Sequence, residues 1–150
     1  MYNIAVQRQI KNVNVPRVID FREWALAVLS KHVFAAEITI RITDENEMSE
    51  LNETWRHKKG PTNVLSFPLD VPKKNETKPL LGDIVICAEV IFREAASQHK
   101  TIKAHFAHMV VHGILHLIGY DHENINDAEI METEEILILK KLGFNNPYEV

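Results

Sequence analysis

The stretch "HGILHLIGYDH", residues 112–122, carries three histidines whose spacing fits one metal site. His112 and His116 are four residues apart, which on an α-helix puts both imidazoles on one face, about 6 Å apart along the axis. Gly119 is expected to end that helix, so that the chain can turn and bring His122 to the same ion. The spacing therefore predicts three imidazole ligands for one cation.

Three neutral imidazoles leave a fourth coordination position open, which is typical of catalytic rather than structural zinc sites. A water bound in that position has a pKa of about 7 instead of about 15.7, and so supplies hydroxide at neutral pH. We expect one ion per chain. Zn2+ is the metal that the ligand types favour, although its identity stays open. Asp121 or a carboxylate further along the chain could hold the outer nitrogens of the histidines.

Gly113 argues against the zinc peptidase that the spacing first suggests. The pattern H-x3-H-x2-G-x2-H is that of the metzincin peptidases, in which a glutamate directly after the first histidine acts as general base. General-base catalysis contributes about 10²- to 10⁴-fold to a rate, and Gly113 cannot provide it. The reaction must therefore depend on metal-activated water, on another side chain or on the substrate. His105 and His108 precede the motif; we interpret them as packing residues, with ligand or substrate contacts as the alternative.

The segment "WRHKKG", residues 55–60, adds a cationic cluster to an otherwise acidic chain. Lys58 and Lys59 are interpreted as compensating the dipole at the end of a helix. Arg56 is interpreted as functional, because a guanidinium offers a two-pronged contact to phosphate oxygens and to the charge of a phosphoryl-transfer transition state. A phosphate substrate also suits a metal site that lacks a carboxylate base.

The pattern of apolar residues predicts an α+β domain with a small mixed β-sheet and about five helices, the histidine motif lying on a central helix and the turn after it. We expect one domain over residues 1–150. The expected strands or extended segments are Tyr2–Gln7, Glu37–Thr43, Pro61–Leu69 and Leu81–Ala88. The expected helices begin at Pro16, at Thr43 or Asp44, at Glu89, at Thr101 and at Asn126 or Asp127; Gly60, Gly119 and Gly143 are expected to end three of them. Residues 70–80 are expected to form an exposed loop.

Within these elements the spacing also predicts which side chains are buried. The first helix should bury Val18, Phe21, Trp24, Ala25, Val28 and Leu29, the second strand Ile38, Ile40 and Ile42, and the second helix Met48, Leu51 and Trp55. Cys87, the single cysteine, is expected to be a buried, inert thiol.

Charge and hydropathy exclude some classes of protein. The formal net charge is −4 and the pI near 6.1, so bulk charge does not indicate a nucleic-acid binder. The acidic residues of 121–135 are interpreted as a solvated helix face. No signal peptide and no apolar run of about 18 residues is visible, so we expect no membrane span. A chain with one cysteine suits the reducing cytoplasm.

Four segments, "RHKKGPTNVLSFP", "LLGDIVIC", "AHMVVHGILHLIGYDH" and "METEE", in this order resemble the YbeY family of bacterial metal-dependent endoribonucleases, the rRNA maturation factors. The resemblance extends from about Ile38 to Tyr148. It implies cleavage of single-stranded RNA in rRNA maturation, 16S rRNA above all, and a part in ribosome quality control. It also implies association with the small ribosomal subunit and its proteins.

The resemblance implies specific site residues as well. The family's metal ligands fall on His112, His116 and His122, and its functionally important arginine falls on Arg56. Asn63 and Ser66 could line the cleft, although we favour structural roles for both. Two alternatives stay open: a metallohydrolase of peptides or small molecules, and a non-catalytic ribosome assembly factor whose metal is structural.

Overall fold

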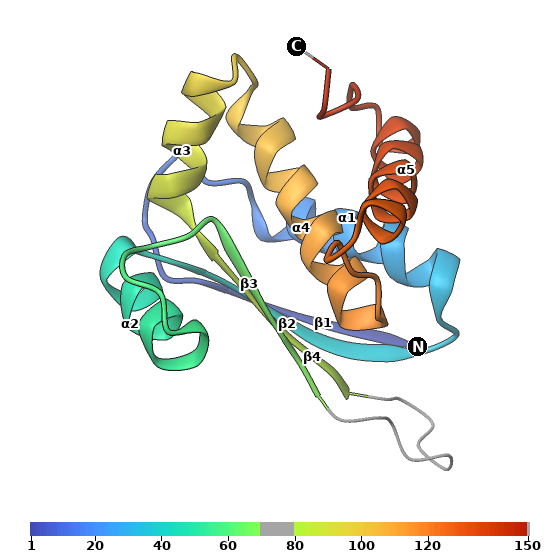
Figure 1. Cartoon of the computed structure of the whole chain (residues 1–150), viewed down its shortest axis with the longest axis horizontal. Helices are drawn as coiled ribbons and strands as arrows, with labels where there is room; N and C mark the ends of the chain where they lie inside the picture. Colours follow the sequence, from blue (N-terminus) through green and yellow to red (C-terminus); the bar gives the residue numbers. More distant parts are fainter. Residues whose placement is uncertain (70–79, 150) are drawn as a thin grey trace.

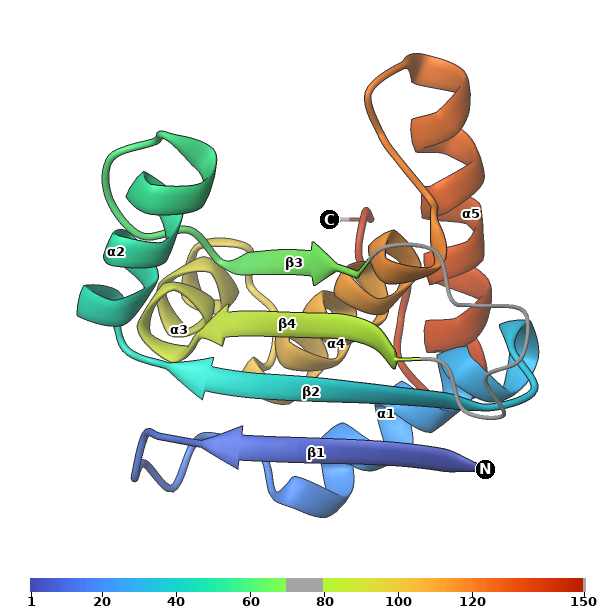
Figure 2. The ribbon, with the colours of Figure 1, turned by 90° about the horizontal axis from the view of Figure 1, so that it is seen from below.

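A computed structural model describes residues 1–69 and 80–149. Within this part of the chain, four strands form one sheet in the order β1-β2-β4-β3. Their bounds are β1 (Tyr2–Arg8), β2 (Ala36–Thr43), β3 (Val64–Pro68) and β4 (Leu80–Cys87). β1, β2 and β4 run parallel, and β3 pairs antiparallel with β4 at one edge (Figure 2). The predicted mixed sheet is confirmed.

Five helices lie in the described residues, in agreement with the prediction. They are α1 (Val18–His32), α2 (Glu45–Arg56), α3 (Ala88–Ser97), α4 (Ile102–Ile118) and α5 (Ile125–Lys141). Helices α1, α4 and α5 lie over one face of the sheet, whereas α2 lies at the other side of the sheet, near one end of the strands (Figure 1). The sheet is therefore covered unequally on its two faces.

The alternation of side chains along β4 explains why both faces need cover. Ile84 and Ile86 belong to the main core beneath the helices, while Val85 and Cys87 belong to a smaller cluster with Met48 of α2. Successive side chains of a strand point to opposite faces, so an apolar run such as "IVIC" requires packing on both sides. Cys87 is fully buried, and burial raises the pKa of its thiol, as expected for an inert cysteine.

Helix α4 carries the histidine motif through the centre of the molecule. It begins where the Thr101 side chain accepts a hydrogen bond from the Ala104 N–H. It ends at Gly119, whose φ of +116° is readily adopted only by glycine. Both predicted ends are confirmed. Because α4 packs against β3, β4, α1, α3 and α5, the positions of its histidines are set by the core.

Several predicted helix ends were wrong. Helix α1 is capped by Arg17, whose backbone N–H bonds to the Asp20 carboxylate, so Pro16 lies outside the helix. Helix α2 starts after Asp44, one of the two predicted caps. It ends at Arg56, where His57 adopts the left-handed conformation, and not at the predicted Gly60. Helix α5 is capped by Asn124 rather than by Asn126 or Asp127.

The predicted core is confirmed except at Val18 and Leu51, which are only partly buried, and at Trp55. Five of the six positions of α1, all except Val18, are buried, as are the three isoleucines of β2. Trp55, predicted to be buried, is 63% exposed, and its ring meets the Phe67 ring of β3 edge-on at 6.4 Å. The predicted loop at 70–80 lies almost entirely outside the described residues. None of the helices in the described residues has the length and apolar character to span a membrane.

Candidate metal centre

His112, His116 and His122 converge at the end of α4 that is nearest the sheet edge strand β3. Each offers a ring nitrogen, and the three nitrogens lie within 4.8 Å of one another. Nε2 of His112 and Nε2 of His116 are 3.1 Å apart. Three nitrogens bound at about 2.0–2.1 Å to a tetrahedral ion lie about 3.4 Å from one another. The cluster thus has the dimensions of a three-histidine metal site, as the spacing predicts.

Hydrogen bonds at the outer nitrogens determine where the ring protons lie. Nδ1 of His116 is 3.0 Å from the Tyr120 carbonyl oxygen, and Nδ1 of His112 is 3.3 Å from Glu135 Oε1. A carbonyl and a carboxylate only accept hydrogen bonds, so in both neutral rings the proton is on Nδ1 and Nε2 presents a lone pair. Two lone pairs that face each other at 3.1 Å repel unless a cation lies between them.

The electrostatic surroundings of His116 also fit a metal. Burial, together with the rings of His112 and His122, lowers the pKa of His116 and so favours the neutral imidazole that binds metals. The donor set of three neutral imidazoles suits Zn2+ and related transition metals. The residues present therefore fit the ion that the motif predicts.

His122 reaches the cluster from the loop between α4 and α5. Gly119 turns the chain, and the Tyr120 N–H then bonds to Leu115 O. The His122 N–H donates to Asp121 Oδ1 at 2.7 Å. Asp121, one of the predicted partners for the outer histidine nitrogens, therefore orients the His122 backbone instead. His122 is exposed, whereas His112 and His116 are half-buried, so the cluster opens to solvent on the His122 side.

Glu135 is the carboxylate that holds the outer nitrogen of His112. Its side chain is 0% exposed, so the interpretation of all acidic residues in 121–135 as a solvated face was wrong for this one. Burial raises the pKa of Glu135, but the hydrogen bonds from His108 and His112 outweigh burial and bring the pKa to about 2. The sequence contains a signal: Glu135 lies at helical spacing from Met131, Ile138 and Leu139, which are buried.

His105 and His108 are both buried, as their interpretation as packing residues requires. Nε2 of His105 bonds to Glu94 Oε1 at 2.8 Å, and Nε2 of His108 bonds to Glu135 Oε1 at 2.6 Å. His108 thus touches the carboxylate that holds His112, which gives it a part in the surroundings of the cluster as well.

Arg56 lies in the same cleft as the three histidines. The cleft has a volume of about 730 Å³ and is bounded by the end of α2, by β3 and by the loop after α4. Arg56 Nη2 donates to Ser66 O at 2.8 Å, and the guanidinium carbon lies 6.0 Å from the centre of the Phe67 ring. Two residues 56 positions apart in the sequence, Arg56 and His112, therefore face one space.

Asn63 and Ser66 line this cleft, but their side chains bond to the protein. Asn63 Nδ2 donates to Glu94 Oε1 at 3.1 Å, and Ser66 Oγ donates to Gly113 O at 3.0 Å. The structural roles favoured for both residues agree with these contacts. Lys58 also lines the cleft, so one of the two lysines interpreted as compensating the helix dipole faces the histidines as well.

A sequence model of the family described as Endoribonuclease YbeY matches residues 3–143 of the chain. The chain belongs to the YbeY family. Endoribonuclease YbeY of Methylococcus capsulatus is 54% identical over 148 residues, covering 99% of this chain and 96% of that protein. Endoribonuclease YbeY of Nitrosococcus oceani is 48% identical over 147 residues, covering 97% of this chain and 96% of that protein.

A solved structure shows the same fold. The solution structure of a Thermotoga maritima protein superimposes with a TM-score of 0.62, covering 98% of this chain and 96% of that one, at 24% identity. The YbeY match includes Arg56 and all three histidines of the cluster, as well as Glu135. Tyr148, which also contacts Glu135, lies beyond the matched residues.

Proposed function

We propose that this chain is a metal-dependent endoribonuclease that hydrolyses phosphodiester bonds of single-stranded RNA in rRNA maturation, 16S rRNA above all, and in ribosome quality control. Its membership of the YbeY endoribonuclease family supports this function. The observation that carries the chemistry is the cleft that joins three imidazoles to one guanidinium. Residues 1–150 act as one domain in this proposal.

His112, His116 and His122 would hold one Zn2+ ion. A divalent ion so held supplies Lewis-acid activation of a water and of a phosphoryl oxygen. Arg56, which lines the same cleft, binds the phosphate and stabilises charge on the transition state. Its bond to Ser66 O orients the guanidinium and uses one of its five N–H donors. An unpaired strand can splay its backbone into such a cleft, whereas a stiff duplex cannot.

The chain would reach its substrate on the small ribosomal subunit, in the cytoplasm. A net charge of −4 gives little long-range attraction for RNA, so contacts with ribosomal proteins would have to supply the affinity. Co-sedimentation of the purified chain with small subunits tests this step: protein that stays in the supernatant at low salt speaks against it.

The metal and the cleavage are tested together on His116→Ala and His122→Ala. Elemental analysis should show that both variants lose zinc, and neither should cleave a single-stranded fragment of 16S rRNA. His99→Ala, which removes an exposed imidazole at the far end of α4, is the control and should keep both properties. A His116→Ala variant that retained full cleavage would sink the proposal. Circular dichroism of the metal-free wild type tests the alternative of a purely structural metal. If the metal were only structural, the metal-free protein would show no thermal unfolding transition.

A further inference from the structure

Glu135 is a fully buried carboxylate next to the histidine cluster. It accepts hydrogen bonds from His108 Nε2 at 2.6 Å, His112 Nδ1 at 3.3 Å and the Tyr148 hydroxyl at 2.9 Å. Burying a charge costs several kcal/mol unless donors surround it, and apolar replacements of buried ionic groups are often as stable. Stability alone therefore does not explain a glutamate at this place.

All three donors direct a proton at Glu135. His108 Nε2 lies 2.6 Å from Glu135 Oε1 and carries the proton of this bond, because a carboxylate only accepts hydrogen bonds. Burial and the charge of Glu135 raise the pKa of the Tyr148 hydroxyl, so this group stays protonated and donates. The carboxylate thus receives the His112 Nδ1–H in a fixed arrangement of neighbours.

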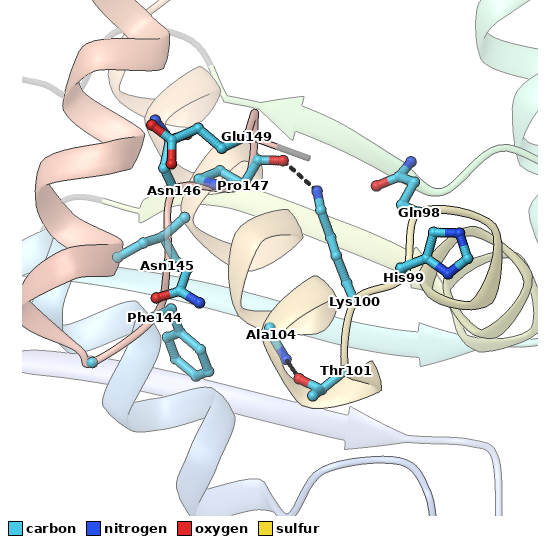
Figure 3. A pocket seen from close by; sticks show the side chains of 12 residues that line it. Gln98, His99, Lys100, Thr101, Ala104, Phe144, Asn145, Asn146, Pro147 and Glu149 are labelled. Atoms are coloured by element: carbon cyan, nitrogen blue, oxygen red, sulfur yellow. Dashed lines mark hydrogen bonds between the residues drawn. The ribbon is translucent and has the colours of Figure 1, made fainter.

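Tyr148 is brought to Glu135 by the C-terminal segment after α5, residues 143–149. Lys100, in the turn between α3 and α4, donates a hydrogen bond to Pro147 O, beside a cavity of about 510 Å³ (Figure 3). Phe144 packs edge-on against Trp24 with the ring centres 6.1 Å apart. The Tyr148 ring then meets the His108 ring edge-on at 5.3 Å. Contacts at Phe144 and Pro147 therefore hold the segment in place just before Tyr148.

We propose that Glu135 is a positioning residue of the metal centre, and that Tyr148 makes the C-terminal segment part of that centre. The inference rests on the proposed metal site. By holding the His112 Nδ1–H, Glu135 turns Nε2 of the ring toward the ion and increases its basicity. Tyr148 holds both carboxylate oxygens, at 2.9 and 3.0 Å, and so keeps the carboxylate from rotating away from His112.

Zn2+ affinity, measured by competition with a chelator, tests this inference without any RNA. Glu135→Gln keeps the shape and removes the charge; its dissociation constant for zinc should rise about 10- to 100-fold. Tyr148→Phe removes only the hydroxyl, and we expect a smaller rise, below about tenfold. Glu129→Gln removes the same charge from an exposed position of α5 and is the matched control, expected to bind zinc like wild type.

Nitrogen NMR of the metal-free wild type gives a second measurement. We expect the His112 proton on Nδ1, and a proton on Nε2 instead would overturn the inference. Equal zinc affinity of wild type and Glu135→Gln would also overturn it while leaving the metal site intact. A wild type that takes up no zinc would overturn the metal site itself. If Glu135→Gln does not fold, the zinc affinity of Tyr148→Phe and the position of the His112 proton test the inference instead.

Discussion

Ser66 Oγ donates a hydrogen bond to Gly113 O at 3.0 Å and so ties β3 to α4, one residue from His112. Gly113 is buried at this contact. A Cβ atom on Gly113 would lie 3.1 Å from Ile84 Cγ2 and 3.4 Å from Ser66 Oγ. The position after the first histidine therefore faces the sheet, and glycine allows the helix to lie close to it. Gly113 therefore permits close packing, in addition to lacking the carboxylate of a zinc peptidase.

Placing the glutamate of a zinc peptidase at this position should therefore damage the fold rather than create a peptidase. Gly113→Glu forces a charged side chain between α4 and β4, and we expect a loss of at least about 3 kcal/mol in the free energy of unfolding. Gly113→Ala adds only one methyl group; the gain of about 1 kcal/mol that alanine brings to a helix should be cancelled by the contact with Ile84. Urea unfolding of the metal-free proteins measures both.

Ser66→Ala is the companion variant, because it removes the hydrogen bond and leaves the space at Gly113 unchanged. We expect it to cost about 1 kcal/mol. A Gly113→Glu protein that unfolded at the urea concentration of wild type and cleaved casein would contradict the packing role of Gly113 and revive the peptidase alternative.

The histidine cluster could be predicted from the sequence because its three residues lie within eleven positions. Helix geometry and one glycine turn are enough to bring them together. The placement of Arg56 in the same cleft could not be predicted by spacing, since it depends on the packing of α2 against β4 and α3. The chemistry of its guanidinium and the resemblance to the YbeY family both pointed to Arg56, and the cleft then showed which residues it faces.

Arg56→Ala should separate metal binding from catalysis. The guanidinium contacts Ser66 O and the Phe67 ring but none of the three histidines, so zinc content should equal that of wild type. We expect cleavage of single-stranded RNA to fall about 10²- to 10³-fold, the usual effect of removing one group that stabilises transition-state charge. Single-turnover cleavage together with elemental analysis measures the two properties.

Two further variants, Arg56→Lys and Lys59→Ala, test whether the loss of cleavage is specific to the Arg56 guanidinium. Arg56→Lys keeps the charge but cannot make a bidentate contact to phosphate, and should recover only part of the cleavage rate. Lys59→Ala removes an exposed cation of the same cluster that does not line the cleft, and should cleave at close to the wild-type rate. Wild-type cleavage by Arg56→Ala would remove the residue from the mechanism.

Gly119→Ala should weaken metal binding by disturbing the turn that brings His122 to the cluster. The φ of Gly119 is +116°, and a Cβ there would meet nothing within 4 Å, so any penalty arises from the backbone alone. We expect a loss of about 1–2 kcal/mol in the free energy of unfolding and a weaker affinity for zinc. Chelator competition and urea unfolding measure the two effects.

Gly60 supplies the matched control, since its φ is +85° and a Cβ there is equally unobstructed, but it lies between α2 and β3. Gly60→Ala should lose similar stability and keep more of its zinc affinity than Gly119→Ala. If both variants bound zinc equally well, the turn at Gly119 would have no special part in placing His122.

The buried carboxylates show where sequence analysis reaches its limit. Acidic residues are usually solvated, so Glu135 and the half-buried Glu94 could be distinguished only by asking which positions fall on the apolar face of their helices. Their donors lie 11 to 31 positions away along the chain, as the pairs Glu94–His105 and Asn63–Glu94 illustrate. Helix packing creates these pairs, and no local pattern contains them.

Glu94 predicts how stability changes with pH at a distance from the metal cluster. The hydrogen bond from His105 lowers the pKa of Glu94 below its ordinary value of 4.5, against the effect of burial. The native state therefore binds fewer protons than the unfolded state, and this carboxylate stabilises the fold above about pH 4.5. The contribution is lost as the pH falls through the native pKa.

Glu94→Gln should cost about 1 kcal/mol at pH 7, and its difference from wild type should shrink below pH 4.5. Urea unfolding between pH 7 and pH 3.5 measures this difference, with the exposed Glu50→Gln of α2 as control. A difference between wild type and Glu94→Gln that stayed constant over this range would show that the carboxylate does not gain its charge-dependent stabilisation from His105.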